Sequence, residues 1–111
     1  MTEGRLRSLI VTIVRKGWGE CVIDASCKAG AEGGTIMFGR GTGDHEQQKI
    51  LGITIQPEEE IVLTVIERNE ADRVLAEIVK ACEMDKPGRG IGFVINLEKV
   101  VGEVHIQPDS G

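Results

Sequence analysis

The sequence predicts an α+β domain in which two helices cover one face of an antiparallel sheet. The chain has 111 residues, a length that suits one domain, so we expect residues 1–111 to fold as a single unit. Apolar residues make up 41% of the chain but aromatic residues only 3%, so the core must be aliphatic. Short segments rich in valine and isoleucine, which favour strands, alternate with two segments of helical periodicity.

The first half of the chain is predicted to form a strand, a helix and a second strand. Residues 5–14, RLRSLIVTIV, are β-branched, apolar and short, as in a strand. From Trp18 to about Ala29 apolar residues recur at helical spacing, and Gly30 stands where it can end that helix. Residues 33–39, GGTIMFG, give the next strand between flanking glycines.

The following segment, residues 42–56, has no clear period and is predicted as a long loop, in which residues 50–55 are a candidate strand-like arm. Residues 59–67, EEIVLTVIE, form the most regular strand pattern. Asn69 is the expected N-cap of a second helix, whose apolar face continues to about residue 83.

Residues 84–90, MDKPGRG, cannot continue that helix and are predicted as a loop. Residues 91–97 give a fourth strand, and residues 99–106 a short final one. The order β-α-β-β-α-β is that of the ferredoxin-like sandwich. Its second sheet face has no helix to cover it, and a small chain covers such a face most simply with copies of itself, so we expect an oligomer.

Charge and cysteine content narrow the class of protein. The net charge of −5 makes nonspecific nucleic-acid binding a poor fit, because that binding neutralises phosphates. The sequence shows neither a secretory signal nor an apolar run long enough to span a bilayer, so we expect a cytoplasmic protein with reduced thiols. Cys21, Cys27 and Cys82 form no CxxC pair, and buried packing is expected of them rather than metal or redox chemistry.

Two Gly-Arg-Gly steps are the main indication of function: Gly39-Arg40-Gly41 and Gly88-Arg89-Gly90. Glycines let a backbone approach a ligand closely, and free N–H groups in such a turn attract anions. Arginine adds a planar cation suited to phosphate. Either step alone is better explained as a plain turn, whereas the two together indicate a composite phosphate site, to which Lys86 can add a charge.

Other functional patterns are weak. There is no GxxxxGK[ST], and GRGIGF follows a helix and precedes a strand, the reverse of the dinucleotide-binding context. No nucleophile–base grouping stands out, so an enzyme is not expected. Asp44, His45 and Glu46 are of metal-ligating types, but adjacent loop residues usually stay solvated. The charge run at residues 56–60, QPEEE, is expected to be solvated as well.

The whole arrangement resembles the PII signal-transduction family. The resemblance rests on the element order, on the glycine step before a long loop, and on EIVLTVIERNEADRVLAEIVKA (60–81) and PGRGIGFVINLEKVV (87–101). It implies a homotrimer that binds an adenine nucleotide, such as ATP, ADP or AMP, in clefts between subunits. It also implies that the loop after the second strand, the T-loop, controls a partner such as a membrane transporter or a metabolic enzyme.

The resemblance implies two sets of site residues by position. For the nucleotide site the resemblance carries over the glycines of the two steps, Gly39, Gly41, Gly88 and Gly90. Arg40 and Arg89 are added to this nucleotide-binding set because they are the cations of the two steps and not because of the family pattern. The partner-binding set lies in the T-loop-like segment at about 42–56 and comprises Thr42, His45, Ile50, Leu51 and Ile53. We expect that segment to be mobile when neither ligand nor partner is bound.

The chain also departs from the family pattern, which indicates a divergent PII-like branch. Ile91 replaces the usual lysine of the second glycine loop, Arg89 replaces an aspartate, and the paired basic residues after the fourth strand are missing. Gly43 replaces the glutamine that helps to hold magnesium and 2-oxoglutarate, so binding of 2-oxoglutarate is not expected.

Two modifications of that family are excluded by composition. The chain has no tyrosine to uridylylate, and residues 42–56 contain no serine to phosphorylate. A second hypothesis stays open and is favoured by the missing basic residues, namely a structural or metal-responsive trimer of the same fold without a nucleotide site. In that case Asp44, His45 and His105 would matter more than the two arginines.

Overall fold

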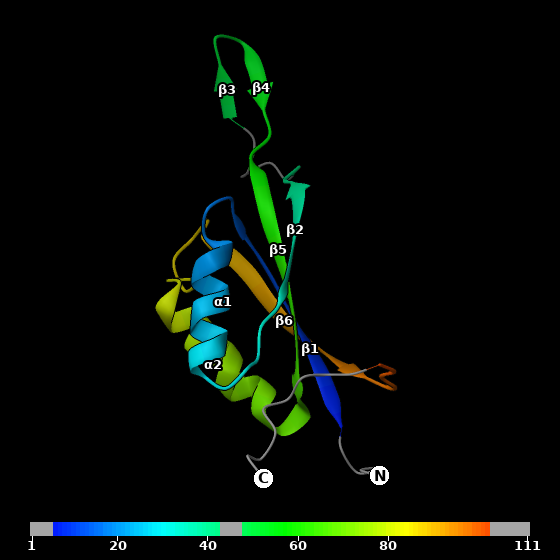
Figure 1. Cartoon of the computed structure of the whole chain (residues 1–111). Helices are drawn as coiled ribbons and strands as arrows, with labels where there is room; N and C mark the ends of the chain where they lie inside the picture. The colour runs from blue at the N-terminus through cyan, green and yellow to red at the C-terminus, as the bar shows by residue number, and fades with distance from the viewer. Residues whose placement is uncertain (1–5, 43–47, 103–111) are drawn as a thin grey trace.

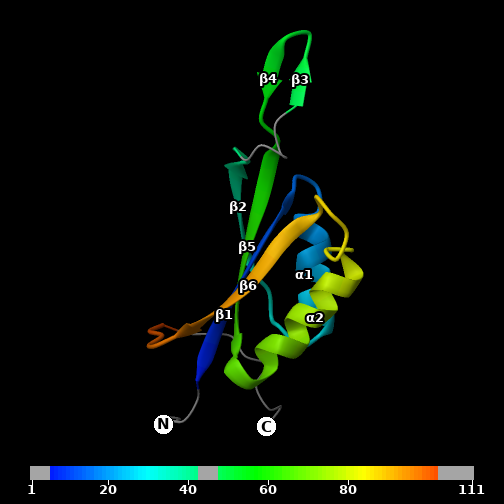
Figure 2. The ribbon, with the colours of Figure 1, turned by 180° about the vertical axis from the view of Figure 1, so that it is seen from behind.

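A computed structural model describes residues 6–42 and 48–102, and it confirms the predicted α+β sandwich. Two helices lie on one face of a four-stranded antiparallel sheet (Figures 1 and 2). The helices are α1 (Gly19–Lys28) and α2 (Ala71–Ala81). The sheet has the order β2-β5-β1-β6, with β1 (Arg7–Arg15), β2 (Thr35–Arg40), β5 (Glu58–Glu67) and β6 (Gly90–Leu97).

The four strands of this sheet lie within a few residues of their predicted bounds. β1 lies at the centre and pairs along its whole length with β5, from Arg7 opposite Glu67 to Arg15 opposite Glu59. Because side chains alternate across a strand, directly opposed residues share a face. Ile10 opposite Thr64 and Thr12 opposite Val62 therefore point toward the helices, and all four are fully buried.

The helix-covered face forms the core of the chain. Its buried members come from both helices and the two central strands, with Ala31 added from the loop before β2: Ile10, Val14, Val22, Ala25, Ala31, Val62, Ile66, Ala71, Val74, Ile78 and Cys82. This core is aliphatic apart from one thiol, as the low aromatic content predicts. Trp18 and Cys21 pack against its edge.

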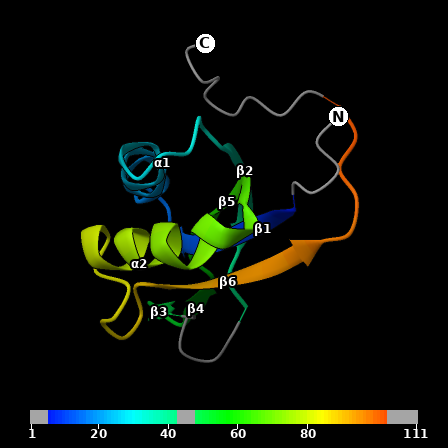
Figure 3. The ribbon, with the colours of Figure 1, turned by 90° about the horizontal axis from the view of Figure 1, so that it is seen from below.

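The opposite face of the sheet has no helix over it among the residues that the structure describes (Figure 3). β6 alone presents three partly exposed apolar side chains there, those of Ile91, Phe93 and Ile95, and Met37 and Val65 continue the patch on β2 and β5. We call this set the open face. The prediction of an uncovered apolar sheet face is confirmed.

The start of the second helix differs from the prediction. A 3₁₀ turn, η1 (Arg68–Glu70), precedes α2, so Asn69 already has a helical backbone and cannot be the N-cap. The cause is tertiary: the Arg68 N–H donates to the Leu6 carbonyl oxygen at 2.9 Å, and its guanidinium donates to the Leu97 carbonyl oxygen at 2.9 Å. These bonds hold the chain in a tight turn where it leaves β5.

Residues 48–55 form a hairpin rather than a loop. β3 (Gln48–Ile50) pairs with β4 (Ile53–Ile55) in a separate two-stranded sheet that projects beyond the end of β5 (Figures 1 and 2). The turn between them is Leu51-Gly52, with φ of 54° and 81°, as in the type I′ turn of tight hairpins. The projection makes the molecule elongated, 59 Å long against 25 and 17 Å. The candidate arm is confirmed, but the long loop is wrong for these residues.

Three smaller predictions meet mixed outcomes. Gly30 has φ of 119° just after α1, which confirms it as a helix stop. No strand forms within residues 98–102, and the rest of the predicted final strand lies outside the described residues. Cys82 is buried and Cys21 half-buried as expected, but Cys27 is exposed, because it lies on the outer side of α1.

Within the described ranges, no helix has the length and apolar character needed to cross a membrane.

Candidate functional site

The two Gly-Arg-Gly steps lie at the same end of the sheet. Arg40 closes β2 opposite Glu58, and Gly90 opens β6 opposite Val14. β2 and β6 are the two edge strands, however, and β5 and β1 lie between them. With neighbouring strands about 4.8 Å apart, three such spacings separate the edge strands by roughly 14 Å. A single chain therefore does not bring the two steps together into one pocket.

The first Gly-Arg-Gly step belongs to the end of a strand and does not form a turn. Gly39 and Arg40 are paired with β5, and the Gly41 N–H donates to the Pro57 carbonyl oxygen at 2.9 Å. The N–H of Arg89 in the second step is also bonded, to the Lys86 carbonyl oxygen at 3.3 Å. The expectation of free N–H groups is thus wrong for Gly41 and Arg89. The Arg40 side chain is exposed and makes no ion pair with any residue that the structure describes.

The second step lines a pocket of about 350 Å³, which we call the Arg89 pocket. Gly88 and Gly90 have φ of 80° and 149°, where other residues are strained. A Cβ at Gly90 would also collide with the Ile13 carbonyl oxygen, so this position requires glycine on two grounds. The lining residues are Ile13, Arg15, Glu59, Gly88, Arg89, Gly90 and Ile91.

Arg89 is held in place by two contacts. Its guanidinium carbon lies 4.7 Å from the centre of the Trp18 ring, a cation–π distance, and its Nη2 lies 3.3 Å from Glu83 Oε1. Lys86 Nζ pairs with the same carboxylate oxygen at 3.2 Å. The arginine is therefore positioned before any ligand arrives, but a phosphate must compete with Glu83 for it.

Three residues of this region are missed or misread from the sequence alone. Arg15 and Glu59 face one another across β1 and β5 and line the Arg89 pocket, which only the strand register reveals. Glu60, expected to be solvated, is half-buried, and its Oε1 accepts a hydrogen bond of 2.7 Å from the N–H of Gly19. A carboxylate at that position stabilises the start of α1, where N–H groups have no partner within the helix.

A surface ion pair lies beside the pocket at the same end of the sheet. Lys16 Nζ is 2.9 Å from Glu58 Oε1, and this hydrogen bond raises the pKa of Lys16. Both side chains are well exposed, so the pair contributes little to stability. The end of the sheet thus carries several charges of both signs.

The partner-binding set is only partly described. Thr42 is exposed just after β2, Ile50 belongs to β3, and His45 lies outside the described residues. At the hairpin tip Leu51 is 96% exposed and Ile53 is 65% exposed. Leu51 also has a left-handed backbone, which costs a side-chain-bearing residue roughly 1–2 kcal/mol.

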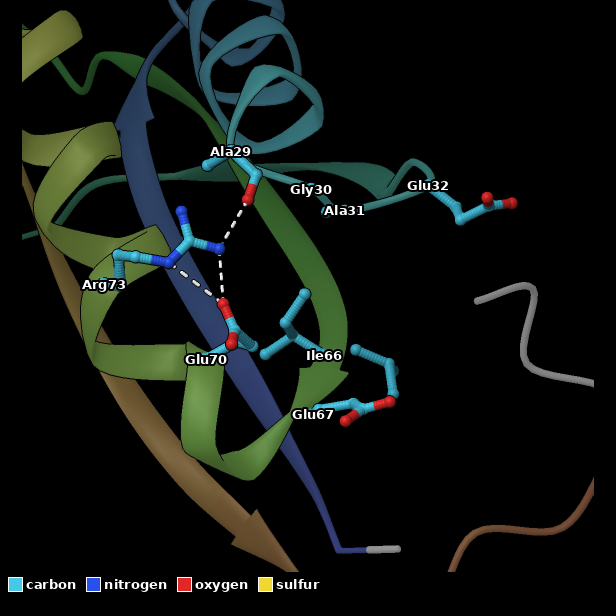
Figure 4. A pocket seen from close by; sticks show the side chains of 9 residues that line it. Ala29, Gly30, Ala31, Glu32, Ile66, Glu67, Glu70 and Arg73 are labelled. Carbon is cyan, nitrogen blue, oxygen red and sulfur yellow. Dashed lines mark hydrogen bonds and ion pairs between the residues drawn. The ribbon is translucent and has the colours of Figure 1, made fainter. Parts of the chain in front are cut away.

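A second pocket, of about 240 Å³, lies at the opposite end of the sheet (Figure 4). Arg73 crosses it from α2, donating to the Ala29 carbonyl oxygen at 2.8 Å and pairing with Glu70. The arginine thereby ties the end of α1 to the start of α2. Its hydrogen bonds and its ion pair join parts of the fold to one another, and no predicted site residue lies in this pocket.

The structure leaves the metal hypothesis untested. Asp44, His45, Glu46 and His105 all lie outside the described residues. Within residues 6–42 and 48–102, no three His, Cys, Asp or Glu side chains gather closely enough to hold a metal ion.

Comparisons with known proteins place this geometry in a family. No curated protein sequence matches the chain. Among solved structures, PII of Arabidopsis thaliana bound to citrate superposes with a TM-score of 0.65 at 20% identity, over 86% of this chain and 79% of that one. A Bacillus cereus protein related to NIF3 superposes with a TM-score of 0.64 at 21% identity, over 86% of this chain, which spans only 26% of that longer one.

These structural matches establish the fold, and the sequence itself supplies the family. The profile described as nitrogen regulatory protein P-II matches residues 7–103, which include both Gly-Arg-Gly steps and the projecting hairpin. The chain therefore belongs to the nitrogen regulatory protein P-II family.

Proposed function

We propose that this P-II family protein is a cytoplasmic homotrimer that binds an adenine nucleotide between subunits and controls a partner through its hairpin. The observation that carries the proposal is the position of the two Gly-Arg-Gly steps. They lie at one end of the sheet but on its two opposite edges. When copies assemble around an axis, the β2 edge of one chain meets the β6 edge of the next, and the two steps then face a common cleft.

The open face supplies the reason to assemble. A monomer that exposes Ile91, Phe93 and Ile95 on one flat sheet leaves a large apolar surface in water. Packing that face against copies of itself buries it, and closed symmetry uses the same surface in every chain. Light scattering coupled to gel filtration should therefore give a mass near three chains.

The Arg89 pocket has groups suited to a nucleotide. Arg89 and Arg15 offer permanent positive charge to phosphate oxygens, and Gly88 and Gly90 keep the backbone close. The Glu59 carboxylate, on the same wall, is suited to accept hydrogen bonds from ribose hydroxyls. Arg40 of the neighbouring subunit would complete the cation set.

The hairpin tip supports control of a protein partner. Leu51 is almost fully exposed in a strained backbone conformation, and strain at an exposed position is typical of functional segments. An apolar tip of this kind suits insertion into an apolar pocket of a transporter or a metabolic enzyme. Nucleotide binding at the base of the hairpin would change its orientation, a population shift driven by differential contacts.

Calorimetric titration with ATP, ADP, AMP and cyclic dinucleotides tests the nucleotide site. We expect at least one adenine nucleotide to bind and Arg89→Ala and Arg40→Ala each to weaken it by about tenfold or more, because a hydrogen bond to a charged group contributes roughly 1.5–3 kcal/mol. Arg73→Ala is the matched control, because this arginine lies at the other end of the sheet. Unchanged binding in both test variants would remove the arginines from the site.

Polycarboxylates belong in the same titration. The Arabidopsis relative was solved with citrate, whereas Gly43 here replaces the glutamine expected to hold magnesium and 2-oxoglutarate. We expect no magnesium-dependent binding of 2-oxoglutarate. Citrate binding that Arg89→Ala abolishes would identify the pocket as a general anion site.

A second candidate function is a structural or metal-responsive trimer without a nucleotide site. The bonded N–H groups of Gly41 and Arg89, and the pairing of Arg89 with Glu83, favour it. In that case the calorimetric titration shows no heat of binding with any nucleotide, and it shows binding of zinc or copper ions instead. Loss of that binding in His45→Ala or His105→Ala would establish the metal alternative.

A further inference from the structure

Two of the three cysteines meet where the helices pack against each other. Cys21 lies on α1, and Cys82 directly follows the last residue of α2. α1 and α2 are in contact along the helix layer (Figure 3). The Cys21 thiol donates to the Ala81 carbonyl oxygen at 3.6 Å, in the peptide group that leads directly into Cys82. The pKa of Cys82 is raised by its burial and, to a smaller extent, by the Cys21 thiol. The Cys21 thiol thus lies against the end of α2, close to Cys82, in the reduced protein.

The two thiols differ in access to solvent. Cys82 is 1% exposed and belongs to the core, whereas Cys21 is only partly buried at its edge. Burial raises the pKa of Cys82 to about 12, so this thiol stays protonated at neutral pH. A small oxidant therefore reaches and reacts with Cys21 first.

We propose that Cys21 and Cys82 form a disulfide within one chain under oxidising conditions, which makes the junction of α1 and α2 a redox modification site. The sequence favours a packing role for all three cysteines, whereas the structure brings two of them close together. A disulfide needs the sulfurs at about 2 Å and compatible backbone positions. Cys82 lies at a helix end, followed by Glu83 with φ of 57°, so its backbone is outside the regular helix and can adjust.

The chemistry balances with a hydroperoxide as the oxidant. The Cys21 sulfur attacks hydrogen peroxide, forms a sulfenic acid and releases one water molecule. The Cys82 sulfur then loses its proton and attacks the Cys21 sulfur, and the displaced hydroxyl group takes up a proton and leaves as a second water molecule. Two thiols lose two hydrogens and two electrons in all, and peroxide is reduced to two molecules of water.

The link would act close to the Arg89 pocket. Glu83 follows Cys82 directly and pairs with Arg89 and Lys86. A disulfide at Cys82 would anchor the start of that loop to α1. The disulfide itself does not depend on the proposed nucleotide site, because it rests on the position of Cys21 against the end of α2 beside Cys82.

Thiol counting in the full-length protein tests the proposal. The reduced protein is treated with hydrogen peroxide, the excess is removed with catalase, and free thiols are counted after unfolding in acid. We expect three thiols per chain before treatment and one afterwards, because one disulfide consumes two. The chain mass should fall by about 2 Da, the two hydrogens lost, and dithiothreitol should restore it.

Peptide mapping identifies the partners. Cleavage before aspartate separates the three cysteines, since Cys21 then lies in residues 1–23, Cys27 in 24–43 and Cys82 in 72–84. We expect a linked pair of the first and third fragments. The control Cys27→Ser should lose its two remaining thiols as before, whereas Cys21→Ser and Cys82→Ala should form no such link.

Three results would overturn the proposal. The first is that all three thiols survive peroxide treatment. The second is a covalent dimer linked through the exposed Cys27. The third is oxidation of Cys21 to a sulfinic acid with no linked fragment, which would show that Cys82 does not reach the sulfenic acid. Mapping of the unmutated chain distinguishes these outcomes even where a variant fails to fold.

Discussion

The two faces of the same sheet differ in how far their side chains are buried within the chain. On the covered face Ile10 and Val62 are fully buried beneath α1 and α2. On the open face Phe93 is 41% exposed and Ile95 is 45% exposed, although their strand pairs directly with β1. Both faces are apolar, so the alternation of side chains alone does not distinguish them. The difference is that residues 6–42 and 48–102 supply two helices to one side and none to the other.

This difference separates two roles. Burial of the covered face stabilises the fold of a single chain, because its apolar surface is removed from water within that chain. The open face gains burial only from another molecule, so its apolar residues contribute to assembly. Substitutions on the two faces should therefore affect different measurements.

The largest effect should come from a charge on the open face. Phe93→Glu would bury a carboxylate in every subunit of the proposed trimer, at a cost of several kcal/mol per ion. We expect light scattering to show a mass near one chain instead of three. Ala76→Glu is the control, because Ala76 is exposed on the outer side of α2 and the variant should remain a trimer. A monomeric parent, or a trimeric Phe93→Glu, would contradict the assignment of this face.

The next largest effect should come from a cavity on the covered face. Ile78 on α2 is fully buried, so Ile78→Ala should lower the free energy of unfolding by about 2–5 kcal/mol in urea denaturation. Its matched control is Ile91→Ala in the monomeric Phe93→Glu variant. Since Ile91 is 59% exposed there, we expect a loss below about 1 kcal/mol. Equal losses at both positions would remove the distinction between the faces.

A pH effect should follow from the buried thiol of Cys82. Its pKa is raised to about 12, whereas the unfolded thiol ionises near the ordinary value of 9.0. A raised pKa gives stability that is complete below pH 9 and is lost as the pH rises toward 12, by up to about 1.4 kcal/mol per pH unit. Denaturation of the reduced parent and of Cys82→Ala at several alkaline pH values should show this slope only in the parent. Parallel curves would exclude it.

The smallest effect should be a gain in stability. The Thr64 hydroxyl is buried on the covered face without a hydrogen-bond partner among the described residues, and such a group costs free energy. Thr64→Val keeps the shape and removes the hydroxyl, so it should raise the free energy of unfolding by about 1 kcal/mol. Thr35→Val, at an exposed position of β2, should change it by less than about 0.5 kcal/mol. A destabilised Thr64→Val would indicate that a buried water satisfies the hydroxyl.

Much of the fold follows from local patterns. The strand of residues 59–67 and the helix of residues 71–81 are predictable because period and burial agree in both. The N-cap at Asn69 is wrong, because hydrogen bonds from Arg68 to distant carbonyl oxygens fix the turn there. The hairpin of residues 48–55 is only half predictable, because its turn, Leu51-Gly52, lacks the asparagine or aspartate that usually marks such turns.

The candidate site shows the same division. The two Gly-Arg-Gly steps are visible in the sequence, and Gly90 proves to be a position that only glycine can fill. The roles of Arg15 and Glu59 are not visible in the sequence, because their position beside Arg89 depends on the register of β1 with its neighbours. The sequence correctly predicts that Arg40 lies at the same end of the sheet as Arg89. It does not reveal that two strands, β5 and β1, lie between them.

The sequence by itself determined the order of the two helices and of the four strands of the main sheet, the aliphatic core, the P-II family and the chemistry available at the two glycine steps. These properties depend on residue type and on short-range periodicity. Only the tertiary structure decided which sheet face is covered, that the steps lie on opposite edges, and that Cys21 lies against the end of α2 beside Cys82. Each of these depends on contacts between residues far apart in the chain, set by strand register and helix packing, which local patterns do not contain.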